Sequence, residues 1–380
     1  MRVLVAMSGG VDSSVVAGLL QEAGHEVIGV TLQLYDHGAA AKRKGACCAG
    51  QDIYDARRVA DRLGFPHYVI DAEERFRNAV MADFADAYAA GETPVPCIRC
   101  NQTVKFADLT ALMRDLGAER LATGHYVRRI EGPDGAELHR AVDLSRDQSW
   151  FLFATTRDQL DVSLFPLGGM ESKDDVRAHA ERLGLAVARK PDSQDICFVP
   201  AGTYADVVAR FRPDALEPGQ IVDRDGHVVG QHEGVGRYTI GQAKRLGNAA
   251  MIDGVRHVVV SLDAGSRRVV VGPAGTAQRR IVLSEVNWLM TPPVAPISCA
   301  PIACMVKLRA RETPHPATVR VIEGGVEVIL ETEALPAPGQ ACVFYDGDRV
   351  LGGGFIRKSV SQVIDVPAGT AVSAAPNLAV

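Results

Sequence analysis

A glycine turn between a predicted strand and a predicted helix carries the first residues that could do chemistry. Residues 8–14, SGGVDSS, follow six residues with the pattern of a buried strand and precede an amphipathic run. Backbone N–H groups at a helix N-terminus bind anions, and glycines let the backbone close on a phosphate without a Cβ in the way. The serine hydroxyls add donors, and Asp12 is suited to hold Mg²⁺ or to cap the helix. The turn predicts a phosphate site, with a plain Asp-capped turn as the alternative.

The glycine turn differs from two common nucleotide-binding motifs. It contains no lysine and is therefore not a GxxxxGK[ST] loop. Its glycines also lack the GxGxxG spacing, so a dinucleotide cofactor is not expected.

Three cysteines in two polar loops supply the second kind of chemistry. Cys97 and Cys100 lie in TPVPCIRCNQTVKF, before a predicted helix that Asn101 is positioned to cap, and Cys197 lies in KPDSQDICFV. The dipole at a helix N-terminus lowers a thiol pKa, which predicts a reactive Cys100. Two cysteines that share a site could carry a persulfide sulfur and release it by forming a disulfide.

Other interpretations of the cysteines stay open at this point. Cys97, Cys100 and Cys197 together could ligate an iron–sulfur cluster with one open position, because Cys-x-x-Cys pairs are frequent in metal and redox sites. Inert buried thiols are the third interpretation. The other five cysteines have no predicted role or lie in strand patterns typical of a core: Cys47 and Cys48, then Cys299, Cys304 and Cys342.

The elements that must position these residues alternate over the first 125 positions, which is typical of a doubly wound parallel sheet. Such a sheet binds ligands at the carboxyl ends of its strands. The predicted strands are 2–7, 26–32, 67–71 and 119–123, and the predicted helices are 12–23, 51–63, 74–89, 103–116 and 172–184.

Length and a change of texture predict three domains. The chain has 380 residues, and Gly, Pro and Val become frequent after about residue 212. We expect an α/β catalytic domain at 1–212, a small mixed domain at 213–275 and a β-barrel-like domain at 276–365. Residues 366–380 are expected to form a loose tail.

Composition limits the compartment and the partners. The chain shows no run of about 18 apolar residues and no signal-peptide pattern, so we expect no membrane span and a cytoplasmic location. The net charge of −5 argues weakly against a nucleic-acid partner, although recurring arginine pairs could form a basic patch. Nothing in the pattern demands more than a monomer.

The SGGVDS string resembles the PP-loop of the ATP pyrophosphatases, which cut ATP between the α and β phosphates. The resemblance implies that the turn holds the pyrophosphate of ATP–Mg²⁺, with no metal bound by protein side chains apart from Mg–ATP or the cluster of the alternative interpretation. The ATP-binding residues implied in this way are Ala6, Met7, Ser8, Gly9, Gly10, Val11, Asp12, Ser13, Leu32 and Gly124.

The chain resembles the tRNA-specific 2-thiouridylase family from residue 5 to about residue 355. The stretches that carry the resemblance include AMSGGVDSS, GETPVPCIRCNQTVKF, LATGHYVR, DLSRDQSWFLF, KPDSQDICFV and GVGRYTIGQAKRLG. The resemblance implies sulfuration of the wobble uridine in a tRNA anticodon arm held by the two later domains. It makes Cys100 the persulfide-bearing nucleophile and Cys197 its partner, with sulfur supplied by a cysteine desulfurase or a sulfur-relay protein.

Further residues are implied to contact the tRNA. Arg309 and Arg311 lie two apart in a stretch predicted to be a strand at 302–309, which would put both on one face. The complete set is Val95, Pro96, Cys97, His125, Arg146, Asp147, Gln148, Arg309, Arg311 and Gln340.

Cys97 departs from the family pattern. Many members have an aspartate there, considered a general acid/base near the target base, and a thiol has a much higher reference pKa. Either that role moves elsewhere, or it is dispensable, or Cys97 strengthens the cluster interpretation.

Overall fold

The structure is a computed structural model, and it describes residues 1–35, 48–192, 196–199, 203–273, 278–292 and 300–358. The predicted tail, Cys47 and Cys299 lie outside the described residues, as does the side chain of Cys48.

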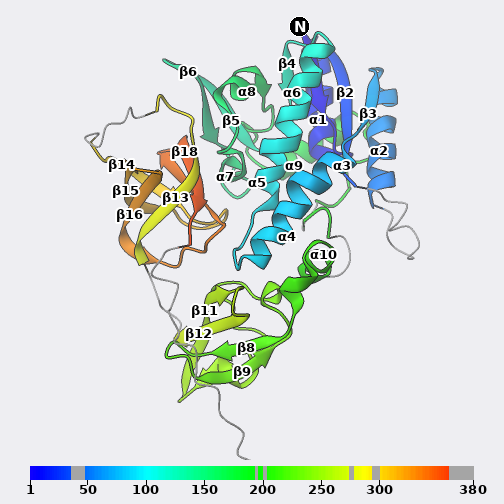
Figure 1. The fold of residues 1–380 in the computed structure, drawn as a ribbon. Coiled ribbons are helices and arrows are strands. Elements are labelled where there is room, and N and C mark those ends of the chain that lie inside the picture. Colours follow the sequence, from blue (N-terminus) through cyan, green and yellow to red (C-terminus); the bar gives the residue numbers. More distant parts are fainter. Residues whose placement is uncertain (36–47, 193–195, 200–202, 274–277, 293–299, 359–380) are drawn as a thin grey trace, which may run out of the picture.

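A five-stranded parallel sheet with helices on both faces forms the first part of the chain (Figure 1). The sheet has the order β3-β2-β1-β4-β7, and it confirms the predicted doubly wound class. Its strands are β1 (Arg2–Ala6), β2 (Glu26–Gln33), β3 (His67–Asp71), β4 (Arg120–Ala122) and β7 (Ser163–Leu164).

The alternation of side chains along β1 fixes which helices cover which face. Val3 and Val5 pack in one core with α1 (Val11–Glu22), α2 (Cys48–Leu63) and α9 (Lys173–Arg182). Leu4 points the other way, into a core with α6 (Phe106–Asp115). A strand that is apolar on both faces is what a parallel sheet covered on both sides requires.

Two helical runs lie between β3 and β4, and each contains a π-helical turn. The first run is α3 (Glu73–Phe76), a π turn (Arg77–Met81) and α4 (Ala82–Ala89); the second is α5 (Pro96–Cys100), a π turn (Asn101–Lys105) and α6. The second run starts seven residues before the predicted start at 103. Pro96 occupies its first position, where the missing N–H costs nothing and the fixed φ suits a helix.

That earlier start corrects two predictions. Asn101 has helical φ and ψ of −62° and −47°, so it lies inside the helical run and does not cap its N-terminus. Cys100 lies at the end of the first helical segment rather than at an N-terminus, so the dipole argument for its reactivity is wrong. The cysteine that lies in the first turn of this helix is Cys97.

Eight strands form the sheet of the last part, and two of them come from the first part of the chain. Strand β13 pairs with both β16 and β18, which closes six strands into a barrel. The hairpin β5 (Val127–Gly132) and β6 (Gly135–Arg140) extends it through the pair Arg349–His139. The barrel strands are β13 (Gln278–Trp288), β14 (Ile302–Lys307), β15 (His315–Ile322), β16 (Gly325–Ala334), β17 (Ala341–Asp346) and β18 (Arg349–Ile356).

A shared core joins the first sheet to the barrel. Trp150 and Phe153 of the first part are buried in the same cluster as Val343 and Tyr345 of β17. The Trp150 indole donates to the Lys307 carbonyl at 3.3 Å. The segment that carries Trp150 is a helix, α7 (Ser149–Leu152), followed by α8 (Arg157–Val162).

A smaller five-stranded sheet of order β10-β11-β12-β8-β9 makes up the middle part (Figure 1). It follows α10 (Tyr204–Phe211), which packs Val207 and Val208 against Phe84 of α4. The strands are β8 (Gly219–Val222), β9 (Val228–His232), β10 (Met251–Ile252), β11 (Val255–Asp263) and β12 (Arg268–Pro273), and short 3₁₀ turns lie at Pro213–Leu216, Val235–Arg237 and Gly247–Ala250. The predicted domain boundaries at 212 and 275 stay predictions.

In the described ranges, no helix is both long and apolar enough to cross a membrane.

Candidate active site

The glycine turn closes tightly at the carboxyl end of β1. Gly9 has φ +74°, and a Cβ there would lie 2.1 Å from the Asp52 carbonyl oxygen of α2. The Ser13 hydroxyl accepts from the Ser8 N–H at 3.1 Å, and the Ser14 hydroxyl donates to the Gly10 carbonyl at 2.8 Å. The turn thus places backbone N–H groups and two hydroxyls around the start of α1, the arrangement expected for a bound phosphate.

Asp12 does not cap α1, which has no side-chain cap. Both of its carboxylate oxygens accept from the Lys173 ammonium at 2.8 Å, and one also accepts from the Tyr126 hydroxyl at 2.7 Å. Burial and the Asp12 carboxylate raise the pKa of Tyr126, which keeps that phenol protonated as a donor. The capping alternative is therefore wrong, and Asp12 belongs to a charged network beside the turn.

Two lysines from distant positions supply the positive charge that the turn itself lacks. Lys173 lies between Asp12 and Asp192, with its ammonium 2.7 Å from the latter carboxylate. Lys190 donates to the Gly9 carbonyl at 2.9 Å and pairs with Asp52 and Asp55 at 2.6 Å each. Sequence reasoning missed both, although Lys190 is the first residue of the KPDSQDICFV stretch.

Gly124 and His125 connect the glycine turn to α6, the last segment of the helical run that carries Cys97 and Cys100. A Cβ on Gly124 would lie 3.0 Å from the Ser13 backbone nitrogen, so the segment after β4 touches the start of α1. The His125 ring shares a 2.8 Å hydrogen bond with the Thr123 hydroxyl and stacks on Phe106, with ring centroids 6.1 Å apart. Burial, together with the nearby Lys105 charge, lowers the pKa of His125 to about 3.

This pKa predicts a pH dependence of stability. Because the folded pKa lies below the ordinary 6.5, the unfolded chain binds a proton first, so His125 costs stability as pH falls from 6.5 toward 3. We expect His125→Asn to remove that part of the slope. Its unfolding free energy relative to wild type should rise by about 2 to 3 kcal/mol between about pH 7 and about pH 4.5, as measured by urea unfolding. Parallel pH profiles for the two proteins would show that His125 does not titrate in this way.

One hydrophobic cluster contains Cys100 and the residues on either side of Cys197. Cys100 is buried there with Val104 of the π turn and with Phe198, the neighbour of Cys197. The Phe198 ring lies 5.7 Å from the Phe76 ring and 5.3 Å from the Phe84 ring, so the segment that carries Cys197 is anchored. Cys97 and Cys197 are exposed, Cys100 is buried, and all three are free thiols.

Burial dominates the ionisation of these thiols. It raises the pKa of Cys100, and it raises the pKa of Cys197 to about 12, while the Lys105 ammonium acts on each in the opposite direction. The structure therefore reverses the predicted low pKa of Cys100, and among the described residues the Lys105 charge acts to lower the pKa of both thiols.

The C-terminal barrel contacts α5, the helix that carries Cys97 and Cys100. The Arg99 guanidinium makes two hydrogen bonds to Glu285 of β13, at 2.5 and 2.7 Å, and lies 4.3 Å from the Phe355 ring centroid. The Gln340 amide donates to the Thr93 carbonyl at 2.9 Å. Gln340 therefore lies beside Thr93, which comes two residues before Val95 in the chain.

The other predicted tRNA contacts fall into two groups. Arg146 is 39% exposed and pairs with Asp192 at 2.7 Å, beside the charged network of the turn. Asp147 is enclosed, with its carboxylate accepting from the Ser149 N–H and hydroxyl, and the Gln148 side chain accepts from the Tyr126 N–H. The last two thus hold the backbone of this segment in place.

Arg309 and Arg311 lie elsewhere in the barrel. Strand β14 ends at Lys307, so the predicted strand to 309 is too long and both arginines lie on an exposed turn. The Glu312 carboxylate accepts from the N–H of Arg309 at 2.9 Å and thereby closes that turn.

Leu32, a predicted ATP-binding residue, is the last but one residue of β2 and packs against two hydrophobic cores.

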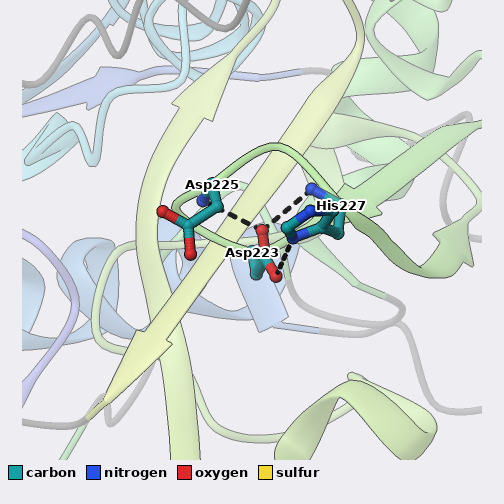
Figure 2. A group of neighbouring side chains, drawn as sticks. All are labelled: Asp223, Asp225 and His227. Carbon is teal, nitrogen blue, oxygen red and sulfur yellow. Dashed lines mark hydrogen bonds and ion pairs between the residues drawn. The ribbon is translucent and has the colours of Figure 1, made fainter.

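A candidate metal cluster in the described residues lies away from the cysteines. Asp223, Asp225 and His227 bring ligand atoms within 4.8 Å of one another in the turn between β8 and β9 (Figure 2). One Asp223 oxygen accepts from the N–H groups of the other two residues, and the other oxygen lies 3.0 Å from the His227 ring. These bonds account for the arrangement as a closed hairpin turn.

Family models match three successive segments of the chain. The tRNA methyl transferase HUP domain matches residues 1–201, the tRNA methyl transferase PRC-barrel domain matches 205–273, and the aminomethyltransferase beta-barrel domain matches 278–356.

Curated relatives match over nearly the full length. The tRNA-specific 2-thiouridylase MnmA of Acidiphilium cryptum (strain JF-5) is 67% identical, covering 94% of this chain and 100% of the relative. The protein of that name from Gluconobacter oxydans (strain 621H) is 62% identical, covering 94% and 99%. Among solved structures, an NMN synthetase from Francisella tularensis is 18% identical, with a TM-score of 0.32 over 56% of this chain and 76% of that one, too low for any argument.

Proposed function

The chain belongs to the tRNA-specific 2-thiouridylase family, and on that premise we propose that it uses ATP to activate the wobble uridine of a tRNA and then replaces O2 with sulfur. The activity is that of a sulfurtransferase acting on tRNA. The product is 2-thiouridine, released with AMP and pyrophosphate.

One arrangement carries the proposal: a short series of contacts joins the glycine turn (residues 8–14) to the helical run that carries Cys100. Gly124 lies against Ser13 of the turn, and His125 stacks on Phe106 directly after the π turn that follows Cys100. An adenylated base in this space would have its phosphate beside the turn and its C2 toward the sulfurs. Two successive steps on one substrate need such an arrangement.

The first step is the transfer of the adenylyl group. Uridine O2 attacks the α-phosphorus of ATP, the bond from that phosphorus to the bridging oxygen breaks, and pyrophosphate leaves with the electron pair, while N3 loses its proton. The negative charge of the departing pyrophosphate would be stabilised by Lys190, by the N–H groups of the turn and by the hydroxyls of Ser8 and Ser13. Lys173 and Tyr126 orient Asp12, the residue best placed to hold the Mg²⁺ that accompanies ATP.

The second step is the transfer of sulfur. The outer sulfur of a persulfide on Cys100 attacks C2, and the C2–O bond to AMP breaks. The Cys197 thiolate then attacks the Cys100 sulfur, the electron pair of the old S–S bond stays on the transferred sulfur, and N3 regains a proton. The enzyme is left with a Cys100–Cys197 disulfide, which a dithiol must reduce before the next cycle.

The tRNA is proposed to lie across the barrel and α5. Its anticodon arm would meet the exposed Arg309 and Arg311 through phosphates, with Arg146 and Gln340 nearer the base. The wobble base must leave its stack to reach the sulfurs, as it does in other enzymes that modify bases. Cys97, on the exposed side of the same helix turn, is then close to the base.

The three thiols also form a donor set that fits an iron–sulfur cluster. Cys97, Cys100 and Cys197 interact electrostatically with one another, and one ligand position would stay open. Such a cluster would supply a site for the incoming sulfide. The persulfide route needs no cluster, and we propose it together with a cysteine desulfurase or relay protein as sulfur source, in a cytoplasmic monomer.

The decisive experiment is an anaerobic assay with protein purified without added iron. ATP–Mg²⁺, a persulfide source and unmodified tRNA with a wobble uridine are supplied, and the digested tRNA is examined for 2-thiouridine by mass. We expect product from colourless, iron-free protein. Product only after cluster reconstitution would replace the persulfide route, and no product in either state would contradict the proposed function.

A further inference from the structure

Lys173 is a buried lysine at a helix position that disfavours positive charge. It is 6% exposed and is the first residue of α9, directly after the N-cap Ser172. The dipole of a helix favours negative charge at this end and positive charge at the other. Because burial also removes water from the ammonium, the side chain needs negative partners from elsewhere in the fold.

The carboxylates of Asp12 and Asp192 are those partners, and together they use every donor of the ammonium. Two N–H groups reach the two oxygens of Asp12 at 2.8 Å each, and one oxygen of Asp192 lies 2.7 Å from the same nitrogen. A cation this close to both oxygens of Asp12 repels a second cation from them. Lys173 and the Mg²⁺ of ATP therefore compete for Asp12.

The Asp192 carboxylate is shared between Lys173 and Arg146. Its second oxygen lies 2.7 Å from the Arg146 guanidinium. The side chain of Arg146 is 39% exposed, whereas that of Asp192 is 18% exposed, so the arginine is the outer end of this charged series and Asp12 is the inner end. An anion that binds Arg146 from outside weakens its hold on Asp192 and leaves more of that negative charge to Lys173.

We propose that Asp192 is a positioning residue that couples the binding of tRNA to the binding of ATP–Mg²⁺. A tRNA phosphate on Arg146 leaves Asp192 to Lys173, the ammonium moves from Asp12 toward Asp192, and both oxygens of Asp12 become accessible to the metal. The Tyr126 hydroxyl, which donates to Asp12 at 2.7 Å, keeps that carboxylate oriented. The inference rests on the proposed function, to which it adds that the two substrates bind with positive cooperativity.

Equilibrium binding of α,β-methylene-ATP with Mg²⁺ tests the coupling. This analogue is not cleaved between the α and β phosphates, so neither chemical step takes part. Its affinity is measured by isothermal titration calorimetry without tRNA and with saturating unmodified tRNA that has a wobble uridine. In the wild-type protein we expect tRNA to tighten binding at least about fivefold, and the analogue to tighten tRNA binding by the same factor.

Substitutions at the two ends of the Asp192–Arg146 pair should act in opposite directions. Arg146→Met leaves Asp192 to Lys173 at all times, so the variant without tRNA should bind the analogue at least about fivefold more tightly than wild type does. Asp192→Asn leaves Lys173 to Asp12, so binding should be weak, and tRNA should change it by less than about twofold. A merely structural role of the pair would weaken binding in both variants.

Glu22→Gln is the matched control. Arg182 of α9 makes two hydrogen bonds to Glu22 of α1, at 2.5 and 2.8 Å, so this substitution breaks an ion pair between the same two helices without touching Asp192. It should keep the full effect of tRNA. If Asp192→Asn fails to fold, the tightening in Arg146→Met decides the test.

The outcomes separate this inference from the proposed function. Wild-type protein that binds tRNA and the analogue independently would overturn the coupling and leave the proposed function intact. The coupling would equally be overturned by a folded Asp192→Asn variant with the full effect of tRNA, or by weaker binding of the analogue in Arg146→Met. Wild-type protein that binds no tRNA, or no analogue, would contradict the proposed function as well.

Discussion

Cys100→Ser abolishes the formation of 2-thiouridine and leaves tRNA binding and adenylation in place: this is the result we expect. A serine oxygen cannot carry a persulfide, so the second step loses its nucleophile while the first keeps every group that it uses. We expect at least about a 10³-fold loss of product formation. tRNA-dependent exchange of pyrophosphate into ATP should stay within about twofold of wild type.

The barrel offers a matched control for this substitution. Cys304 lies in β14, and burial raises its thiol pKa as it does that of Cys100, so Cys304→Ser changes a cysteine that has no place in the mechanism. It should retain thiolation. Full activity of Cys100→Ser would remove Cys100 from the mechanism, whereas parallel loss of exchange and thiolation would mean that the substitution had damaged the first step.

The positions of the phosphate turn and of the parallel strands could be predicted from local sequence. The alternation along β1 and the glycines after it are local signals, and the structure has β1 at Arg2–Ala6 and the left-handed φ at Gly9. The lysines that complete the site could not be predicted in this way. Lys173 and Lys190 come from positions more than 160 residues further along; the packing of α9 on α1 brings Lys173 to the turn, and Lys190 lies beyond the end of α9.

The errors near the cysteines have a common physical cause. Asn101 is of a residue type that favours helix N-caps, and it follows a Cys-x-x-Cys stretch that resembles a loop, so the local sequence predicts a helix start that is too late. Pro96 was the better signal, because proline favours the first helical position. The burial of Cys100 depends on Phe198, almost a hundred residues away, and no local pattern predicts such a contact.

Gly9→Ala is the second substitution for which we expect a large effect. Gly9 has φ +74°, which is costly for any residue with a Cβ, and that Cβ would lie 2.1 Å from the Asp52 carbonyl oxygen. The backbone of α2 must move, and it carries Asp52 away from Lys190, which also binds the Gly9 carbonyl. We expect a loss of about 2 to 4 kcal/mol in unfolding free energy and at least about a 100-fold loss of pyrophosphate exchange.

Gly24→Ala separates crowding from backbone strain. Gly24 has φ +80° but no atom within 4 Å of the position of a Cβ, so alanine there meets only the strain of the left-handed conformation. It should cost about 1 kcal/mol and keep exchange activity. If the two variants lose equal stability and both keep exchange, the contact between the turn and α2 does not hold the phosphate site. If Gly9→Ala alone loses exchange while its thiols react with iodoacetamide as in wild type, the turn acts in the first step only, and the two halves of the active site are separable.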